Sequence, residues 1–175
     1  MMSATDFSTN YFALFELPEQ FAVDSALLKS RYRQLQRDYH PDRFASANSP
    51  DRRAAEQISG RINQAYATLS SPLLRAEYLL SLQGVQRDDA ETVKDPEFLM
   101  QQMALREALD DLASETEFEN FSRTIQQLYS QESNCFQQAF ERADYQAAMA
   151  SVSRLHFFDK LSNELDVLQA RFFLD

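Results

Sequence analysis

Two helix-period patterns of apolar residues flank a short motif that interrupts a helix, and this arrangement constrains the fold most. The motif is Tyr39-His40-Pro41-Asp42-Arg43. On both sides, apolar residues recur at i, i+4, i+7 and i+11, which makes one apolar stripe on a helix. The stripes are Leu28, Tyr32, Leu35 and Tyr39, then Ile58, Ile62, Ala65 and Leu69. Proline lacks an N–H and disfavours helical angles in the residue before it, so we expect His40, Pro41 and Asp42 at the tip of an antiparallel helical hairpin.

The first helix of this hairpin has a basic face. Lys29, Arg33 and Arg37 lie opposite the apolar stripe at about 100° per residue. Like charges at i, i+4 cost a helix about 0.2–0.5 kcal/mol per pair. The pattern indicates an acidic partner for this face, although acidic side chains from the next helix could serve, and it is also typical of a solvated basic face.

The composition predicts an all-α protein. The chain has 175 residues and 44% apolar content, enough for one or two globular domains. It is poor in glycine, proline and β-branched residues, which favours helices over strands. Its two glycines, Gly60 and Gly84, exclude the glycine-rich loops that bind nucleotides. Gly60 costs its helix about 1 kcal/mol relative to alanine, and close helix packing is a possible reason.

The net charge of −10 is unevenly distributed. Residues 1–84 carry 9 Lys/Arg and 9 Asp/Glu, whereas residues 85–175 carry 8 and 18, so that 8 − 18 = −10. The acidic second half argues against nucleic acid as a partner. No segment approaches the roughly 18 apolar residues of a membrane span, and residues 1–6 show no secretory or transit signal.

We predict two domains: residues 1–84, a linker at 85–95, and an acidic antiparallel three-helix bundle at 96–175. Helix starts are expected where the capping rules are met. These sites are Asp24, Ser71-Pro72, Asp95-Pro96, Thr116-x-x-Glu119 as a capping box, and Asp144. Val85 and Val93 of the linker could pack against both domains.

The first helix of the bundle has apolar residues on two faces. Its core face is predicted from Phe98, Leu105, Leu109 and Leu112. The other side carries Leu99, Met100 and Met103 together with Glu107 and Asp111. One possibility is that the first domain or the linker covers these side chains. The other is that these flexible apolar side chains, with the acidic residues beside them, form a binding surface for a partner. Phe157 on the last helix could extend this patch or belong to the core.

No constellation supports catalysis or a metal. His40 and Asp42 are adjacent at a hairpin tip with no pocket implied. Two histidines and one cysteine, His40, His156 and Cys135, make no metal-binding spacing. Cys135 is interpreted as a small buried residue in reducing surroundings. We therefore expect no enzyme activity, no cofactor and no metal.

The hairpin motifs identify a known domain. The basic helix, the His-Pro-Asp loop and the second helix ending in Asn63-Gln64-Ala65-Tyr66 resemble a J-domain, with Tyr11-Phe12-Ala13-Leu14-Phe15 before them and Ser71-Pro72-Leu73-Leu74-Arg75 after. The resemblance implies docking on a chaperone ATPase of the DnaK class and stimulation of its ATP hydrolysis. The implied chaperone-binding residues are Lys29, Arg33, Arg37, His40, Pro41, Asp42 and Arg43.

The J-domain followed by an acidic bundle resembles the HscB family of iron–sulfur co-chaperones. Phe98-Leu99-Met100, Leu105-Arg106-Glu107, Phe157-x-Asp159-Lys160-Leu161 and Arg75-Ala76-Glu77-Tyr78 are similar to its motifs. The resemblance implies that the bundle holds the cluster scaffold IscU and delivers it to the chaperone HscA in a bacterial cytoplasm. The implied scaffold-binding residues are Leu99, Met100, Met103, Glu107, Asp111 and Phe157.

The chain departs from this family's pattern at two positions. Ala104 stands where an acidic residue is frequent, and Met103 where leucine is frequent. These departures keep the apolar part of the contact and change its polar part. Two other functions remain open: a client-binding protein with an inert J-domain, and a J-protein for a different client.

Overall fold

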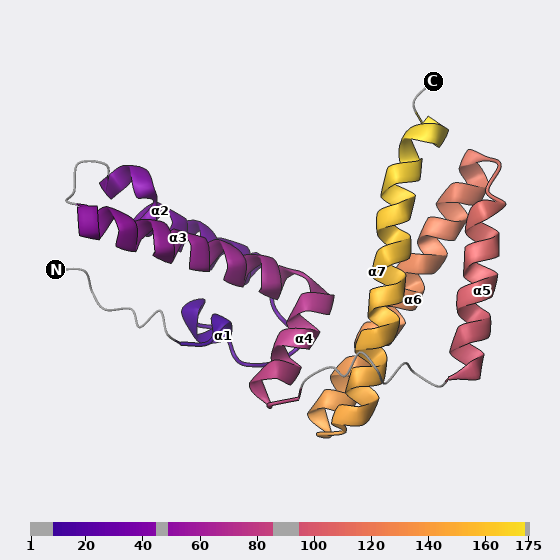
Figure 1. Ribbon diagram of the computed structural model, residues 1–175, viewed down its shortest axis with the longest axis horizontal. Helices are drawn as coiled ribbons and strands as arrows, with labels where there is room; N and C mark the ends of the chain where they lie inside the picture. Colours follow the sequence, from indigo (N-terminus) through magenta and orange to yellow (C-terminus); the bar gives the residue numbers. More distant parts are fainter. Residues whose placement is uncertain (1–8, 45–48, 86–94, 174–175) are drawn as a thin grey trace. The chain divides into compact units, whose positions relative to one another are not determined.

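The computed structural model describes residues 9–44, 49–85 and 95–173. Within these ranges the chain forms α-helices and one 3-10 turn, with no β-strand, which confirms the predicted all-α class (Figure 1). The chain divides into two compact units, Met1–Leu82 and Gln83–Asp175. Of the predicted linker at 85–95, residues 86–94 lie outside the described ranges, and so does the expected packing of Val93.

The first unit is built on a helical hairpin. Its elements are α1 (Tyr11–Leu14), α2 (Ser25–Tyr39), the 3-10 turn η1 (Pro41–Phe44), α3 (Ser49–Ser70) and α4 (Pro72–Leu82). Leu28 of α2 and Ile62, Ala65 and Leu69 of α3 are buried, as the two stripes predict. The stripe of α2 is less completely covered toward the tip, where Leu35 is half-buried.

Arg75 and Tyr78 of α4 connect this helix to the hairpin, to Phe21 and to α1. The Arg75 guanidinium donates to the carbonyl oxygen of Leu69 at 3.1 Å and lies 5.0 Å from the ring centroid of Phe21. The Tyr78 hydroxyl accepts from the backbone N–H of Tyr11 at 2.9 Å, and their rings stack with centroids 4.4 Å apart. Burial raises the pKa of Tyr78. The Arg-Ala-Glu-Tyr motif is thus a packing device.

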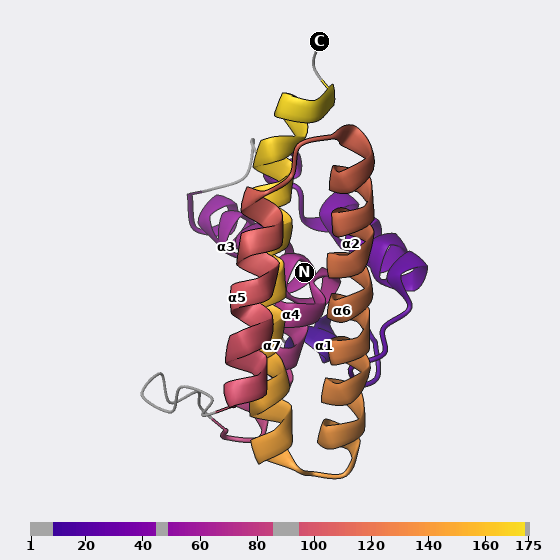
Figure 2. The same ribbon diagram turned by 90° about the vertical axis from the view of Figure 1, so that its right-hand side faces the viewer.

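The second unit is an antiparallel three-helix bundle of α5 (Pro96–Asp110), α6 (Glu115–Glu141) and α7 (Tyr145–Phe173) (Figures 1 and 2). The expected core face of α5 is confirmed, because Phe98, Leu109 and Leu112 are buried and Leu105 packs against them. From α7, the large buried side chains are Val152, Leu155, Phe158, Leu161 and Leu165. Antiparallel packing of this kind follows from the short connections between the helices.

Most predicted helix starts are confirmed, but the capping box lies two residues earlier than the sequence pattern predicts. Ser114 caps α6: its hydroxyl accepts from the N–H of Glu117, and the Glu117 carboxylate accepts from the N–H of Ser114. Thr116 lies inside α6. Ser114 and Thr116 are each followed by a glutamate three residues later, so both match the capping-box pattern. The extended backbone of Ser114 shows that it is the residue that precedes the helix. Asp24 and Asp95 cap α2 and α5 as expected.

Two smaller expectations were wrong. Gly60 is exposed, and a Cβ added there would meet nothing within 4 Å, so close helix packing does not explain it. Cys135 is exposed rather than buried. The buried stripe of α6 passes instead through Glu132, Phe136 and Ala139, and the neighbouring Cys135 points away from it.

Candidate functional site

Proline shapes the tip of the hairpin. α2 ends at Tyr39, and His40 takes extended backbone angles (φ −62°, ψ 131°), as a residue before proline should. Pro41 then begins η1, where its missing N–H costs nothing because the first N–H groups of a helix have no partner within it. The predicted exposure of this tip agrees with the side chains of His40 and Asp42, which are 51% and 90% exposed.

His40 and Asp42 interact with each other. The backbone N–H of Asp42 donates to Nδ1 of His40 at 3.3 Å, and Oδ2 of Asp42 lies 3.5 Å from the same nitrogen. A neutral imidazole that accepts at Nδ1 carries its proton on Nε2, which can donate to a partner. The arrangement presents one carboxylate and one imidazole to solvent, which suits recognition of another protein's surface rather than acid–base catalysis.

The basic face of α2 is exposed. Lys29, Arg33 and Arg37 all lie at the surface. Within the described ranges, neither Lys29 nor Arg33 forms an ion pair, and the Arg37 guanidinium donates to the neutral Oε1 of Gln34 at 3.1 Å. Acidic side chains of α3 therefore do not neutralise this face in the described structure. The repulsion among the three basic side chains of α2 therefore remains, which favours an acidic partner outside this chain.

Arg43 joins the tip to the end of α2. Its guanidinium donates to the carbonyl oxygen of Arg37 at 2.8 Å and lies 3.8 Å from Oδ1 of Asp38. A cation at the C-terminus of a helix satisfies a carbonyl group and interacts favourably with the helix dipole. Arg43 thus orients the tip against the basic helix, so that His40 and Arg37 belong to one surface.

The second candidate surface is the apolar patch of α5, which we define as Leu99, Met100 and Met103. These side chains are 57%, 71% and 66% exposed, while Phe98 and Leu109 of the same helix are buried. The bundle therefore completes its core without the patch. Exposed apolar side chains gathered on one helix face are typical of a protein-binding surface, and methionine adapts readily to a partner's shape.

Acidic residues adjoin the patch. Glu107 and Asp111 are exposed, and α5 has no basic residue in its last turn. Carboxylates at the C-terminus of a helix are unfavourable for the helix itself, because that end carries partial negative charge. Asp111 is the C-cap of α5, and its N–H bonds to the carbonyl oxygens of Glu107 and Leu109. Glu107 and Asp111 therefore destabilise the end of α5, and their charge favours a basic partner.

Phe157 occupies a position between core and patch. It is half-buried, and its ring meets Phe98 edge-on with centroids 5.7 Å apart. The Arg106 guanidinium lies 5.7 Å from its ring centroid and pairs with Glu164. Both readings of Phe157 from the sequence are thus partly met: it packs on the core cluster and still offers surface beside α5.

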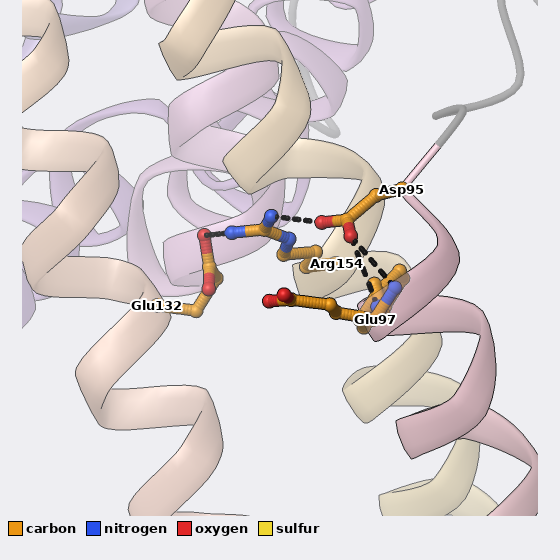
Figure 3. Close-up of polar contacts among 5 residues, drawn as sticks. Asp95, Glu97, Glu132 and Arg154 are labelled. Atoms are coloured by element: carbon orange, nitrogen blue, oxygen red, sulfur yellow. Dashed lines mark hydrogen bonds and ion pairs between the residues drawn. The ribbon is translucent and has the colours of Figure 1, made fainter.

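A charged cluster holds the start of α5, and the sequence reasoning missed it (Figure 3). Arg154 of α7 donates to Oδ2 of Asp95 at 2.6 Å, and its other terminal nitrogen lies 3.6 Å from Oε1 of Glu132 on α6. Asp95 accepts from the N–H of Phe98 and of Glu97 at 3.1 Å each. The available signal was Glu132, a charged residue on the apolar stripe of α6.

The cluster shifts the pKa values of Asp95 and Arg154. The N–H of Phe98, and then Arg154, lower the pKa of Asp95 because they stabilise its carboxylate. Partial burial works against the charge of Arg154, but Asp95 and Glu132 more than offset it and raise its pKa. Asp95 and Arg154 therefore remain charged at neutral pH. Together with Glu132, they tie the start of α5 to α6 and α7.

The residues predicted for the two sites thus fall on two separate units. Those of the tip and of α2 lie together in the first, and those of α5 and Phe157 in the second. No group of three or more His, Cys, Asp or Glu that could hold a metal occurs among the described residues. In the same ranges, no helix is both long and apolar enough to cross a bilayer.

A helical hairpin with an exposed His-Pro-Asp tip and a basic helix defines the class of J-domain co-chaperones. A family model described as "DnaJ domain" matches residues 10–78, and one described as "HSCB C-terminal oligomerisation domain" matches residues 94–166. The chain belongs to the HscB family of co-chaperones. This confirms the resemblance found in the motifs.

Curated relatives and solved structures agree with this assignment. The chain is 41% identical to a co-chaperone HscB homolog of Photobacterium profundum over 94% of its own length and 99% of the relative's, and 38% identical to HscB of Proteus mirabilis over 94% and 98%. The structure of HscB from Vibrio cholerae matches with a TM-score of 0.85 and 40% identity, covering 93% of this chain and 99% of that one. Human HscB matches with a TM-score of 0.88 and 28% identity, covering 94% and 84%.

Proposed function

We propose that this protein stimulates the ATPase of a specialised DnaK-class chaperone, HscA, and delivers the iron–sulfur scaffold protein IscU to it. The observation that carries the proposal is the presence of two exposed surfaces on two separate units, one charged and one apolar, in a chain of the HscB family. Each surface has the chemistry of a protein-binding site, and one chain that binds two proteins brings them together.

The chaperone side of the proposal uses the tip and α2. Lys29, Arg33 and Arg37 would meet an acidic surface of the ATPase, and Arg43 would hold the tip against them. His40, Pro41 and Asp42 would then contact the region that controls hydrolysis. An adaptor accelerates another protein's ATPase by binding more tightly to its hydrolysis-competent state. The chain itself therefore acts as a regulator and needs no catalytic group.

The scaffold side uses the bundle. Leu99, Met100 and Met103 would supply the apolar contact, Phe157 would extend it, and Glu107 and Asp111 would select a basic rim on the partner. The iron–sulfur cluster would remain on the scaffold as cargo. Residues 1–84 and 96–175 would serve as the chaperone domain and the scaffold domain, joined at 85–95. The bacterial relatives support a location in a bacterial cytoplasm.

The test is the steady-state ATPase rate of HscA with this protein, with IscU, and with both. We expect the ATPase rate with both proteins present to exceed the sum of the two separate stimulations. His40→Gln should abolish stimulation and leave IscU binding unchanged, whereas Met100→Ser should weaken the synergy and leave basal stimulation by the J-domain. If His40→Gln also lost IscU binding, the chaperone site and the scaffold site would not be independent, which would contradict the proposal.

The same experiment separates two other functions. A passive client-binding protein with an inert J-domain would bind IscU and leave the ATPase rate unchanged. A J-protein for a different client would stimulate the ATPase with no effect of IscU. Either result would reject the proposal.

A further inference from the structure

α5 and α7 lie side by side and run in the same direction, in a constant register (Figure 2). Arg154 meets Asp95 across a sequence separation of 59 residues, and Arg106 meets Glu164 across 58. Between these two contacts, Phe98 packs against Phe157. Because the register is constant, the seam between the two helices continues from the α5 patch toward the end of α5.

One face of α5 leads from the patch to this seam. Leu99, Met103, Arg106 and Asp110 recur at i, i+4, i+7 and i+11, so they share one helix face. Leu99 and Met103 belong to the patch, and Arg106 follows it, paired with Glu164 of α7. Asp110 then stands beyond this pair, in the next part of the seam. A partner that binds the patch therefore has a continuous surface leading past Arg106.

A groove of about 770 Å³ opens at that point between α5 and α7. Its apolar lining includes Leu109 from α5 and Val167 and Leu168 from α7. Val167 is 80% exposed, more than any residue of the patch. The volume is in the range of roughly 300–1,000 Å³ that holds a small ligand, or here a few side chains. The groove could thus bury an aliphatic side chain that a partner brings along the seam.

The groove carries an excess of acidic groups. Asp110, Asp159 and Glu164 line it, together with Lys160 and His156. Glu164 is paired with Arg106, whereas Asp110 has no ion pair among the described residues and Asp159 accepts only from the amide of Asn163, at 3.1 Å. The second half of the chain carries 18 acidic and 8 basic residues, so a second copy would be repelled. The charge therefore favours a basic partner.

We propose that the partner of the α5 patch extends along the α5–α7 seam into this groove, where it places an aliphatic side chain flanked by lysine or arginine. The aliphatic group packs on Leu109, Val167 and Leu168, and the flanking cations meet Asp110 and Asp159. This proposal rests on the proposed function, because it takes the scaffold protein IscU as the partner. It adds a second anchor, with its own charge preference, to the apolar patch.

The test is calorimetric titration of the full-length protein with purified IscU at two salt concentrations. Val167→Asp should weaken binding about tenfold, because it puts a charge where the aliphatic group must pack. Asp110→Lys should weaken binding less and should reduce its dependence on salt. Met100→Ser marks the effect of the patch itself. Glu119→Lys is the matched control: it makes the same charge change at an exposed position that lines another surface, between α6 and α7, and should leave binding unchanged.

The outcomes separate the two proposals. If Met100→Ser weakens binding and both groove variants bind as the wild type does, the groove lies outside the interface and only this inference fails. If the wild type does not bind IscU, the proposed function fails and the groove proposal fails with it. Loss of self-association by Val167→Asp in sedimentation, with IscU binding unchanged, would assign the groove to a second copy and overturn the inference. Circular dichroism verifies that the variants fold, which the exposure of Val167 and Asp110 leads us to expect.

Discussion

The hairpin tip and the α5 patch are both exposed, but they are built in different ways. The tip depends on local backbone chemistry: Pro41 ends α2, and Arg43 reaches back to Arg37 six residues earlier. The patch depends on long-range contacts, because Arg154, 59 residues from Asp95, holds the start of its helix. The tip should therefore tolerate changes elsewhere in the chain, whereas the patch should be sensitive to changes in α7.

The largest expected effect is on the tip. His40→Gln should abolish stimulation of the chaperone ATPase, because the flexible glutamine side chain does not present an imidazole ring beside Asp42 to the chaperone. The tip contributes little to the core, so the free energy of unfolding should stay within about 0.5 kcal/mol of the wild type. ATPase assays and urea unfolding check this. A clearly destabilised variant would mean that the tip is not locally determined.

The next effect is on the patch. Met100→Ser should weaken scaffold binding by about tenfold, since it removes an apolar anchor from an exposed position. Stimulation of the ATPase by the protein alone should not change. Titration calorimetry measures the affinity, with Glu119→Lys as control. Equal loss of both activities would break the distinction between the two surfaces.

Arg154→Met tests whether the long-range contacts of Arg154 support the helix that carries the patch. Glu132 is buried and would lose its cation, so we expect a loss of about 1–3 kcal/mol in the free energy of unfolding. Adding Glu132→Gln should recover part of it, because an amide carries no buried charge. Urea unfolding of single and double variants measures this coupling. Scaffold binding should fall in Arg154→Met although Met100 is untouched, and unchanged binding would show that α5 needs no such anchor.

Acid should weaken the anchor of the patch, which is the contact of Asp95 with Arg154. The pKa of Asp95 is lowered in the folded state, first by the N–H of Phe98 and then by Arg154. A carboxyl group whose pKa is lower when folded stabilises the protein above its unfolded pKa, and this contribution is lost as pH falls through the folded value. Asp95→Asn should therefore flatten the acid side of the stability–pH curve below about pH 4. An identical acid dependence in this variant would contradict the assignment.

The smallest expected effect is Gly60→Ala. The position is helical and exposed, and an added Cβ meets nothing within 4 Å. We expect a gain of roughly 0.5–1 kcal/mol, because alanine restricts the unfolded chain. Thermal unfolding measures it, and ATPase stimulation should not change. A destabilised variant would indicate a contact at this face that the described residues do not provide.

Much of the fold followed from the sequence because its signals are local. The stripes placed Leu28 and Ile62 in the core, proline and aspartate marked helix starts, and the patch of Leu99, Met100 and Met103 was visible as an excess of apolar residues on one helix. The error at Thr116 shows the limit of this reasoning: two positions satisfied the same capping template, and only the packed chain selected Ser114.

The sequence by itself determined the helices, the exposed His-Pro-Asp tip and the family, because helix period, proline geometry and motif spacing act over a few residues. Only the tertiary structure decided how the bundle holds its surface. Nothing local pairs Arg154 with Asp95 and Glu132, sets Phe157 between core and solvent, or brings Asp110 beside Val167. Those contacts depend on the register between α5 and α7, which packing of the whole core sets.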